Sequence, residues 1–403
     1  MKALYFDNSL PKIAVLKALS LVDKFAALGR FSPVQYAEVP EPSLPNERWL
    51  KVRNLACGLC GTDMHLIFMD MDPKTFYAAV PGIERKFLGH ELVAEVVEVG
   101  RDAGDWQLGE RVAMRIDWPS CYQLEIDPPC PQCAAGSYML CENVGRKPLP
   151  LRDMGGGFSP YMVMHRTQPF RLPKDLPTER AVLVEPTASA MHGVLKADVK
   201  PGDRVLVIGA GTIGLLAVAI TAALHPEAEV SCLARYPFQA EAAKTCGAGH
   251  VLVEDSSVYQ SVADKTGARY IKGPFGNEIL LGGYDVIYDT VGNDNTLHNA
   301  LRWTKAGGQL VLLGINFKPG KIDYSPIWSQ EIRVTGINCH GTEADGVNSF
   351  EKAAQLLTDP SFAVDHLVTH RFTMDQYKDA IHTFLNKRAE KAIKIVLEHP
   401  QTA

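Results

Sequence analysis

The stretch Asp203-Arg-Val-Leu-Val-Ile-Gly-Ala-Gly-Thr-Ile-Gly214 decides how this chain folds. An apolar strand runs into a G-x-G-x-x-G pattern that opens an apolar helix, and this context separates the pattern from an ordinary tight turn. Gly209 permits the turn, Gly211 lets the backbone approach a pyrophosphate, and Gly214 allows the helix to pack closely on the strand. Because the helix N-terminus faces the anion, we predict a dinucleotide site here. Its predicted contacts are Gly209, Gly211, Thr212, Ile213 and Gly214.

Strands and helices alternate beyond this stretch. Further strands are predicted at 229–234, 284–289 and 308–314, and a second helix at 237–246. This alternation is typical of a parallel, doubly wound sheet. Val291 and Gly314, close to the ends of the two later strands, are also assigned to the cofactor site. The sequence therefore predicts an α/β dinucleotide-binding domain over residues 189–339.

The rest of the chain has a different pattern. Up to about residue 185 it holds short valine-rich strands, for example at 49–54, 92–99 and 111–114. Such strands without long intervening helices predict a partly open β-barrel. Helices at 346–357 and 374–386 and a last strand at 392–397 are predicted near the C-terminus. We expect residues 1–188 and 340–403 to form one catalytic domain.

Residues 10–28 form an unusual apolar stretch. On a single helix its leucine, isoleucine, valine, alanine and phenylalanine residues would cover almost the whole circumference. One interpretation is a helix packed on its own domain. The other is a subunit contact or a lid over a pocket.

The composition excludes several classes of protein. The chain has 403 residues, 46% of them hydrophobic and 22% charged, and a net charge of −5. This balance argues against a nucleic-acid partner. Val205–Leu224 is uncharged and long enough to span a bilayer, but its glycines favour a strand, a turn and a helix. Lys12 and Lys17 interrupt the first apolar stretch, so we expect no export signal, no membrane partner and a cytoplasmic location.

The end of the second strand of the sheet bears on the cofactor's ribose. A free 2′-hydroxyl is usually bound there by an acidic residue about 20 residues after the glycines. Ala234 and Arg235 lie at this point, and no carboxylate is present. Because a guanidinium pairs well with a phosphate, we predict NADP(H) rather than NAD(H). The alternative is that Arg235 is an ordinary surface charge.

Candidate metal ligands are scattered through the first domain. Cys57-Gly-Leu-Cys-Gly-Thr-Asp-Met-His65 is followed by Gly89-His-Glu91 and by Val184-Glu-Pro-Thr187. A thiolate, an imidazole and carboxylates could meet around one Zn²⁺, whose catalytic sites keep one position open. A second cluster, Cys130-x2-Cys133-x7-Cys141, also favours metal, since clustered cysteines in a cytosolic protein bind metal more often than they form disulfides.

Together with Gly109-Glu-Arg-Val112, these motifs resemble those of the zinc-dependent medium-chain dehydrogenase/reductase family over almost the whole chain. The resemblance implies a GroES-like catalytic domain with a Rossmann domain inserted into it. It implies that Cys60 and His90 bind a catalytic zinc. It also implies that Glu91 and Glu185 either bind this metal or lie beside its ligands.

Three further roles follow from the resemblance. Asp63 would orient the ligand histidine, as zinc-bound imidazoles require. Thr62 would contact the substrate alcohol, and His65 would be the distal proton acceptor, reached through the nicotinamide ribose. Two insertions depart from the family pattern, at residues 10–30 and around residues 69–77. The second would lie near the mouth of the pocket.

The resemblance also implies a structural zinc held by Cys130, Cys133 and Cys141. The family's remaining cysteine, three residues before Cys130, is Asp127 here. Either Asp127 supplies an oxygen or Cys121 a fourth thiolate, and we favour Asp127 because its spacing matches the missing position. The alternative is a lobe that has lost zinc and keeps free thiols. The other cysteines are expected to be small core residues, namely Cys57, Cys232, Cys246 and Cys339.

The resemblance implies an oxidoreductase acting on CH–OH groups of a small molecule and assembled as a homodimer or homotetramer. We predict a zinc-dependent alcohol dehydrogenase or carbonyl reductase that transfers a hydride between NADP(H) and its substrate. A sugar or polyol dehydrogenase is the alternative, because Glu185-Pro186 is similar to the polyol, glucose and threonine branch. More distant alternatives are a zinc-free reductase of activated alkenes and a cofactor-binding regulatory protein without catalysis.

Overall fold

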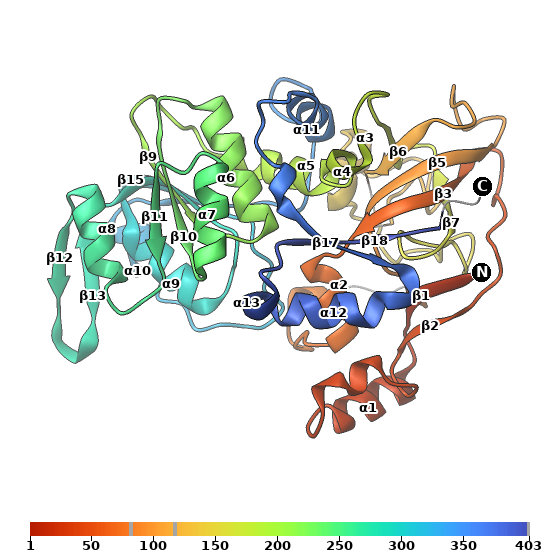
Figure 1. The fold of residues 1–403 in the computed structure, drawn as a ribbon, viewed down its shortest axis with the longest axis horizontal. Helices are drawn as coiled ribbons and strands as arrows, with labels where there is room; N and C mark the ends of the chain where they lie inside the picture. Colours follow the sequence, from red (N-terminus) through yellow and green to blue (C-terminus); the bar gives the residue numbers. More distant parts are fainter. Residues whose placement is uncertain (80–83, 116–118, 401–403) are drawn as a thin grey trace. The chain divides into compact units, whose positions relative to one another are not determined.

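The computed structural model describes residues 1–79, 84–115 and 119–400. The chain divides into two compact units (Figure 1). The first, here called the catalytic unit, runs from Met1 to Glu185 and resumes at Val368. The second, here called the Rossmann unit, is Pro186–Leu367.

The second boundary lies later than the predicted one at residue 340. Residues beyond 340 stay with the Rossmann unit because they contact its helices. Glu343 Oε1 lies 2.7 Å from His192 Nδ1, and the Cys246 sulfur lies 3.7 Å from His366 Nε2. The expected boundary is therefore corrected to Leu367.

The Rossmann unit is built on a parallel six-stranded sheet in the order β11-β10-β9-β14-β15-β16. The strand order runs outward from β9 in both directions, which is the doubly wound arrangement predicted from the sequence. The strands are β9 (Arg204–Ile208), β10 (Glu229–Ala234), β11 (His250–Val253), β14 (Tyr284–Asp289), β15 (Thr304–Leu312) and β16 (Arg333–Gly336). The helices are α5 (Val184–Val194, which begins in the catalytic unit), α6 (Thr212–Leu224), α7 (Pro237–Thr245), α8 (Val258–Thr266), α9 (Asp294–Trp303), α10 (Ser325–Ser329), α11 (Ser349–Thr358) and the 3₁₀ turn η5 (Asp365–Leu367). A separate antiparallel hairpin, which the sequence analysis did not predict, is formed by β12 (Arg269–Lys272), η4 (Pro274–Gly276) and β13 (Glu278–Leu281).

The catalytic unit contains two sheets. A seven-stranded sheet has the order β17-β18-β3-β5-β6-β8, with β7 also paired to β3. A three-stranded sheet has the order β2-β1-β4. The strands are β1 (Lys2–Asp7), β2 (Val34–Glu38), β3 (Trp49–Gly58), β4 (Arg85–Phe87), β5 (Glu91–Val99), β6 (Arg111–Met114), β7 (Tyr161–His165), β8 (Pro169–Arg171), β17 (Val368–Thr373) and β18 (Lys394–Glu398). The helices are α1 (Leu10–Leu19), α2 (Gly61–Phe68), α3 (Pro131–Ala134), α4 (Thr178–Ala181), α12 (Tyr377–Leu385) and α13 (Lys387–Glu390), with 3₁₀ turns η1 (Lys24–Leu28), η2 (Phe76–Ala79), η3 (Tyr138–Leu140) and η6 (Met374–Gln376).

The apolar stretch at residues 10–28 is not one continuous helix, as the sequence had suggested. It breaks after Leu19 into α1 and η1. Leu16 and Ala27 are buried in the core of the catalytic unit. Leu21 and Val22, in the connection, are 88% and 93% exposed. The stretch therefore packs on its own unit along one side only.

The long apolar segment after Asp203 folds as β9, a glycine turn and α6, and most of α6 is buried. In the part of the chain that the structure describes, no helix combines the length and the apolar character needed to cross a bilayer.

Candidate active site

The elbow between β3 and α2 places the first candidate metal ligand. Cys60 lies at the N-cap of α2, and its backbone N–H donates to Asp63 Oδ2 at 3.0 Å. Gly58, at the end of β3, is paired with Glu91 of β5. A Cβ at Gly58 would collide with the Glu91 carboxylate, so glycine leaves room for this side chain beside the end of β3.

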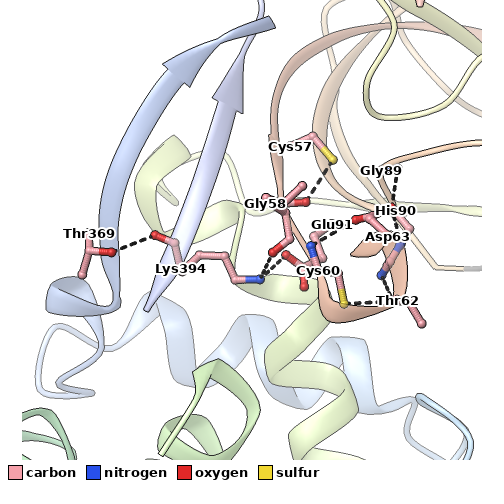
Figure 2. Close-up of polar contacts among 11 residues, drawn as sticks. Cys57, Gly58, Cys60, Thr62, Asp63, Gly89, His90, Glu91, Thr369 and Lys394 are labelled. Atoms are coloured by element: carbon pink, nitrogen blue, oxygen red, sulfur yellow. Dashed lines mark hydrogen bonds and ion pairs between the residues drawn. The ribbon is translucent and has the colours of Figure 1, made fainter. Parts of the chain in front are cut away.

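Three donor atoms meet at this elbow. The Cys60 sulfur, a His90 ring nitrogen and a Glu91 carboxylate oxygen all lie within 4.8 Å of one another. Thr62 Oγ1 donates to the Cys60 sulfur at 3.0 Å and lies 3.5 Å from His90 Nε2, as Figure 2 shows. Thiolate, imidazole and carboxylate are the ligand types that Zn²⁺ takes in proteins, so these residues fit the metal.

Asp63 connects the two segments that carry these donors. Its Oδ1 accepts the backbone N–H of Gly89 at 3.0 Å and lies 3.9 Å from His90 Nδ1. A carboxylate on one ring nitrogen turns the other nitrogen toward the metal position. Burial raises the pKa of the Asp63 carboxyl, while His90 and the N–H groups of Gly89 and Cys60 act in the opposite direction.

Glu91 has a buried partner that the sequence analysis missed. Lys394 Nζ, from β18, forms an ion pair with Glu91 and donates to the Leu59 carbonyl at 3.3 Å (Figure 2). Burial alone would lower the pKa of the Lys394 ammonium, but the charge of Glu91, followed by that of Cys60, raises it above its usual value. The available signal was a lysine directly before the apolar run of this strand, Ile395–Leu397.

Glu185 lies apart from this donor set among the described residues. It lies in the first turn of α5, is partly buried, and its negative charge also raises the pKa of Lys394. The structure therefore brings together Cys60, His90 and Glu91, and keeps Glu185 as a nearby charge.

The four sulfurs of Cys121, Cys130, Cys133 and Cys141 form a second cluster, within 4.8 Å of one another. Asp127, which was expected to complete this set, is exposed and outside it. The Cys121 sulfur lies 3.7 Å from that of Cys141 and accepts the Cys130 N–H at 3.3 Å. The preference for Asp127 is therefore corrected to Cys121, because the chain folds back over the lobe. Four thiols fit a closed, tetrahedral zinc site.

Backbone donors surround these sulfurs. Burial opposes ionisation of Cys130, but the N–H groups of Cys133 and Glu142 lower its pKa to about 7. Burial raises the pKa of Cys141 to about 11. A bound cation would stabilise the thiolate of a cysteine such as Cys141, whose ionisation burial otherwise opposes.

The glycine turn has the geometry predicted for a dinucleotide site. Gly209 has φ +98°, and α6 begins at Thr212 directly after the N-cap Gly211. A Cβ at Gly211 would meet nothing within 4 Å, which leaves room for a phosphate, whereas a Cβ at Gly214 would collide with the Gly209 carbonyl.

Val291 and Gly314, which the sequence analysis assigned to the cofactor site, lie beside this turn. A Cβ at Gly209 would be 2.5 Å from Val291 Cγ2, and one at Gly314 would collide with the Val291–Gly292 backbone. The buried carboxylate of Asp289 accepts the N–H groups of Val291 and Gly292, each at 3.0 Å, and so shapes the turn after β14. The sequence analysis did not identify Asp289 as a member of this site.

Arg235 follows Ala234, the last residue of β10, and its side chain is 72% exposed. Its Nε lies 3.8 Å from a carboxylate oxygen of Glu254, which follows β11. The sequence analysis did not anticipate this acidic neighbour, because Glu254 comes from the adjacent strand.

The chain matches two family models. Residues 46–174 match the alcohol dehydrogenase GroES-like domain, and residues 212–359 match the zinc-binding dehydrogenase model. The sorbitol dehydrogenase of Bacillus subtilis (strain 168) is 27% identical over 371 residues, covering 91% of this chain and 95% of that protein. The (R,R)-butanediol dehydrogenase of the same strain is 29% identical over 351 residues, covering 85% and 89%.

A solved structure from Sinorhizobium meliloti 1021, bound to NADP, is 29% identical with a TM-score of 0.68, and covers 91% of this chain and 95% of its own. With these matches, the chain belongs to the zinc-dependent medium-chain dehydrogenase/reductase family. The predicted family and fold class are confirmed.

Replacement of Lys394 tests the buried ion pair. Lys394→Met leaves the Glu91 carboxylate without its cation, and we expect the free energy of unfolding to fall by about 3–5 kcal/mol. The double variant Lys394→Met/Glu91→Gln removes both charges and is expected to recover most of this loss. Denaturant unfolding of the metal-free protein measures both effects. A single variant as stable as the wild type would contradict the ion pair.

Metal content tests the cysteine cluster. We expect Cys121→Ala to lose one zinc per chain, because the closed site lacks a thiolate, whereas the exposed Asp127→Ala keeps it. Elemental analysis after dialysis against a weak chelator measures this. Loss in Asp127→Ala but not in Cys121→Ala would show that the assignment is reversed.

Proposed function

We propose that this protein is a zinc-dependent alcohol dehydrogenase or carbonyl reductase that transfers a hydride between NADP(H) and a small alcohol or carbonyl substrate. The observation that carries the proposal is the meeting of Cys60, His90 and Glu91 beside the Thr62 hydroxyl. The sorbitol and butanediol dehydrogenases among its relatives support a CH–OH substrate. In this proposal Cys60 and His90 hold the catalytic zinc, and Cys121 joins Cys130, Cys133 and Cys141 around a structural zinc.

Bound zinc supplies Lewis acidity at the substrate oxygen, and the bound nicotinamide gives or takes the hydride. Asp63 holds His90 in place by accepting the Gly89 N–H and lying beside Nδ1. The Thr62 hydroxyl takes the proton of the substrate alcohol at Oγ1 and passes its own proton toward His65. His65 lies one turn further along α2, on the same face of the helix.

The cofactor binds through the turn at Gly209, Gly211 and Gly214, where the open side of Gly211 and the N-terminus of α6 receive the pyrophosphate. Arg235 pairs with the 2′-phosphate of NADP(H). The exposure of its side chain supports this role, since the guanidinium can leave the Glu254 carboxylate and pair with the more highly charged phosphate.

A polyol substrate is the second candidate. It is supported by the sorbitol dehydrogenase among the relatives and by Glu185, whose charge acts on Lys394 beside the donor set. Assays of the zinc-loaded protein with simple alcohols, ketones, sugars and polyols, each with both nicotinamide cofactors, separate the two candidates. Absence of hydride transfer with every substrate of the panel would count against both.

Loss of a zinc ligand tests the proposed reaction. We expect Cys60→Ser and His90→Ala to reduce kcat by at least about 10³-fold. NADPH should still bind, because the zinc ligands and the glycine turn belong to different units. Steady-state kinetics and fluorescence titration with NADPH measure the two properties. Near-native turnover of either variant in metal-free buffer would reject the zinc mechanism.

Two substitutions test the choice of cofactor. Arg235→Ala removes a charge-assisted contact, so we expect NADPH binding to weaken by about 1.5–3 kcal/mol and NADH binding to stay nearly unchanged. Glu254→Gln removes the competing carboxylate and is expected to leave NADPH binding unchanged or tighter. Calorimetric titration with each cofactor measures these effects. If Glu254→Gln weakens the binding of NADH and Arg235→Ala leaves the binding of NADPH unchanged, the protein prefers NAD(H).

A further inference from the structure

The helix that carries Thr62 and His65 ends in an unusual turn. Met69, the C-cap of α2, has φ 49° and ψ 43°, a left-handed conformation that few residues other than glycine adopt. The turn brings Asp70 back to the last turn of the helix. There Asp70 Oδ1 lies 2.7 Å from His65 Nδ1.

This contact decides which nitrogen of His65 carries a hydrogen. An ionised carboxylate can only accept a hydrogen bond, so the hydrogen lies on Nδ1. The proton-accepting role then falls to Nε2.

We propose that Asp70 is a positioning residue for proton transfer, which fixes the orientation and tautomer of His65. The inference rests on the proposed function, in which Thr62 passes the substrate proton toward His65. Thr62 Oγ1 takes the proton of the substrate hydroxyl and passes its own proton toward His65. Nε2 is the acceptor at the end of this path, while the hydrogen on Nδ1 stays bonded to the Asp70 carboxylate. The imidazolium then returns the proton to solvent, to which its side chain is 31% exposed.

Asp70 belongs to the stretch that lengthens the interval between Cys60 and His90. In this proposal the insertion therefore supplies a residue of the proton path. Because both side chains of the pair are partly exposed, the contact contributes little to stability, and its loss should appear in the chemistry.

The same stretch offers a matched control. Asp72 is a second carboxylate two residues further on, but it accepts the backbone N–H of Lys74 at 2.8 Å. Asp72→Asn therefore makes the same change of charge without touching His65.

The experiment compares Asp70→Asn, Asp70→Glu, Asp72→Asn and His65→Gln in the full-length, zinc-loaded protein. An asparagine amide can donate to Nδ1, which allows the other tautomer. We expect Asp70→Asn to lower kcat about tenfold, with KM and NADPH affinity within about twofold of wild type. Asp70→Glu should restore part of the rate, and Asp72→Asn should match the wild type.

A second measurement does not depend on turnover. In the ¹⁵N-histidine spectrum of the protein without zinc or cofactor, the His65 signal, assigned with His65→Gln, should report Nδ1–H in the wild type and a mixture in Asp70→Asn. Wild-type kcat together with an unchanged tautomer in Asp70→Asn would overturn the role of Asp70. A wild-type rate in His65→Gln would instead overturn the relay in the proposed function.

Discussion

The candidate site depends on one buried carboxylate. Asp63 is 2% exposed and accepts the N–H groups of Cys60 and Gly89 while it lies beside His90. These contacts fix the start of α2 against the turn that precedes β5, so two segments far apart in sequence present their donors at one point. Without the carboxylate, the buried N–H of Gly89 and the partly buried N–H of Cys60 would lose their acceptor, at a cost of about 1–3 kcal/mol for a buried group left unsatisfied, and the imidazole would lose its orientation. The chemistry and the local fold therefore rest on the same contacts.

The C-terminal strand completes the site. β18 pairs with β3, with Val396 opposite Gly58, and so carries Lys394 to the buried face where Glu91 needs a cation. A carboxylate buried without a partner would be strongly destabilising, and Lys394 supplies the opposite charge to Glu91, one of the three donors. The returning strand supplies a charge as well as a hydrogen-bonded edge.

Local signals in the sequence were sufficient for much of this architecture. The glycine turn follows from the strand and helix around it, and β10 and β14 have the predicted bounds because their apolar runs end at turn residues. Spacing alone failed where the chain folds back. Asp127 lies at the expected spacing from Cys130, but a spacing in sequence does not show where a side chain points. Cys121 joins the cluster from a different turn. The roles of Lys394 and Glu254 were not predicted, because their partners, Glu91 and Arg235, lie in or next to other strands. The break after Leu19 was not predicted, because an apolar sequence alone does not show which of its residues pack against the rest of the unit.

Both insertions that set this chain apart from the family pattern converge on α2. Leu16 and Ala27, from the first, share a hydrophobic core with Ile67 on the inner side of the helix. The second begins at the turn that returns Asp70 to His65. The donors Cys60, His90 and Glu91 are held by Asp63, Gly58 and Lys394, none of which belongs to an insertion. The residues that hold the three donors therefore lie outside both insertions, whereas the insertions pack against α2 or follow directly after it.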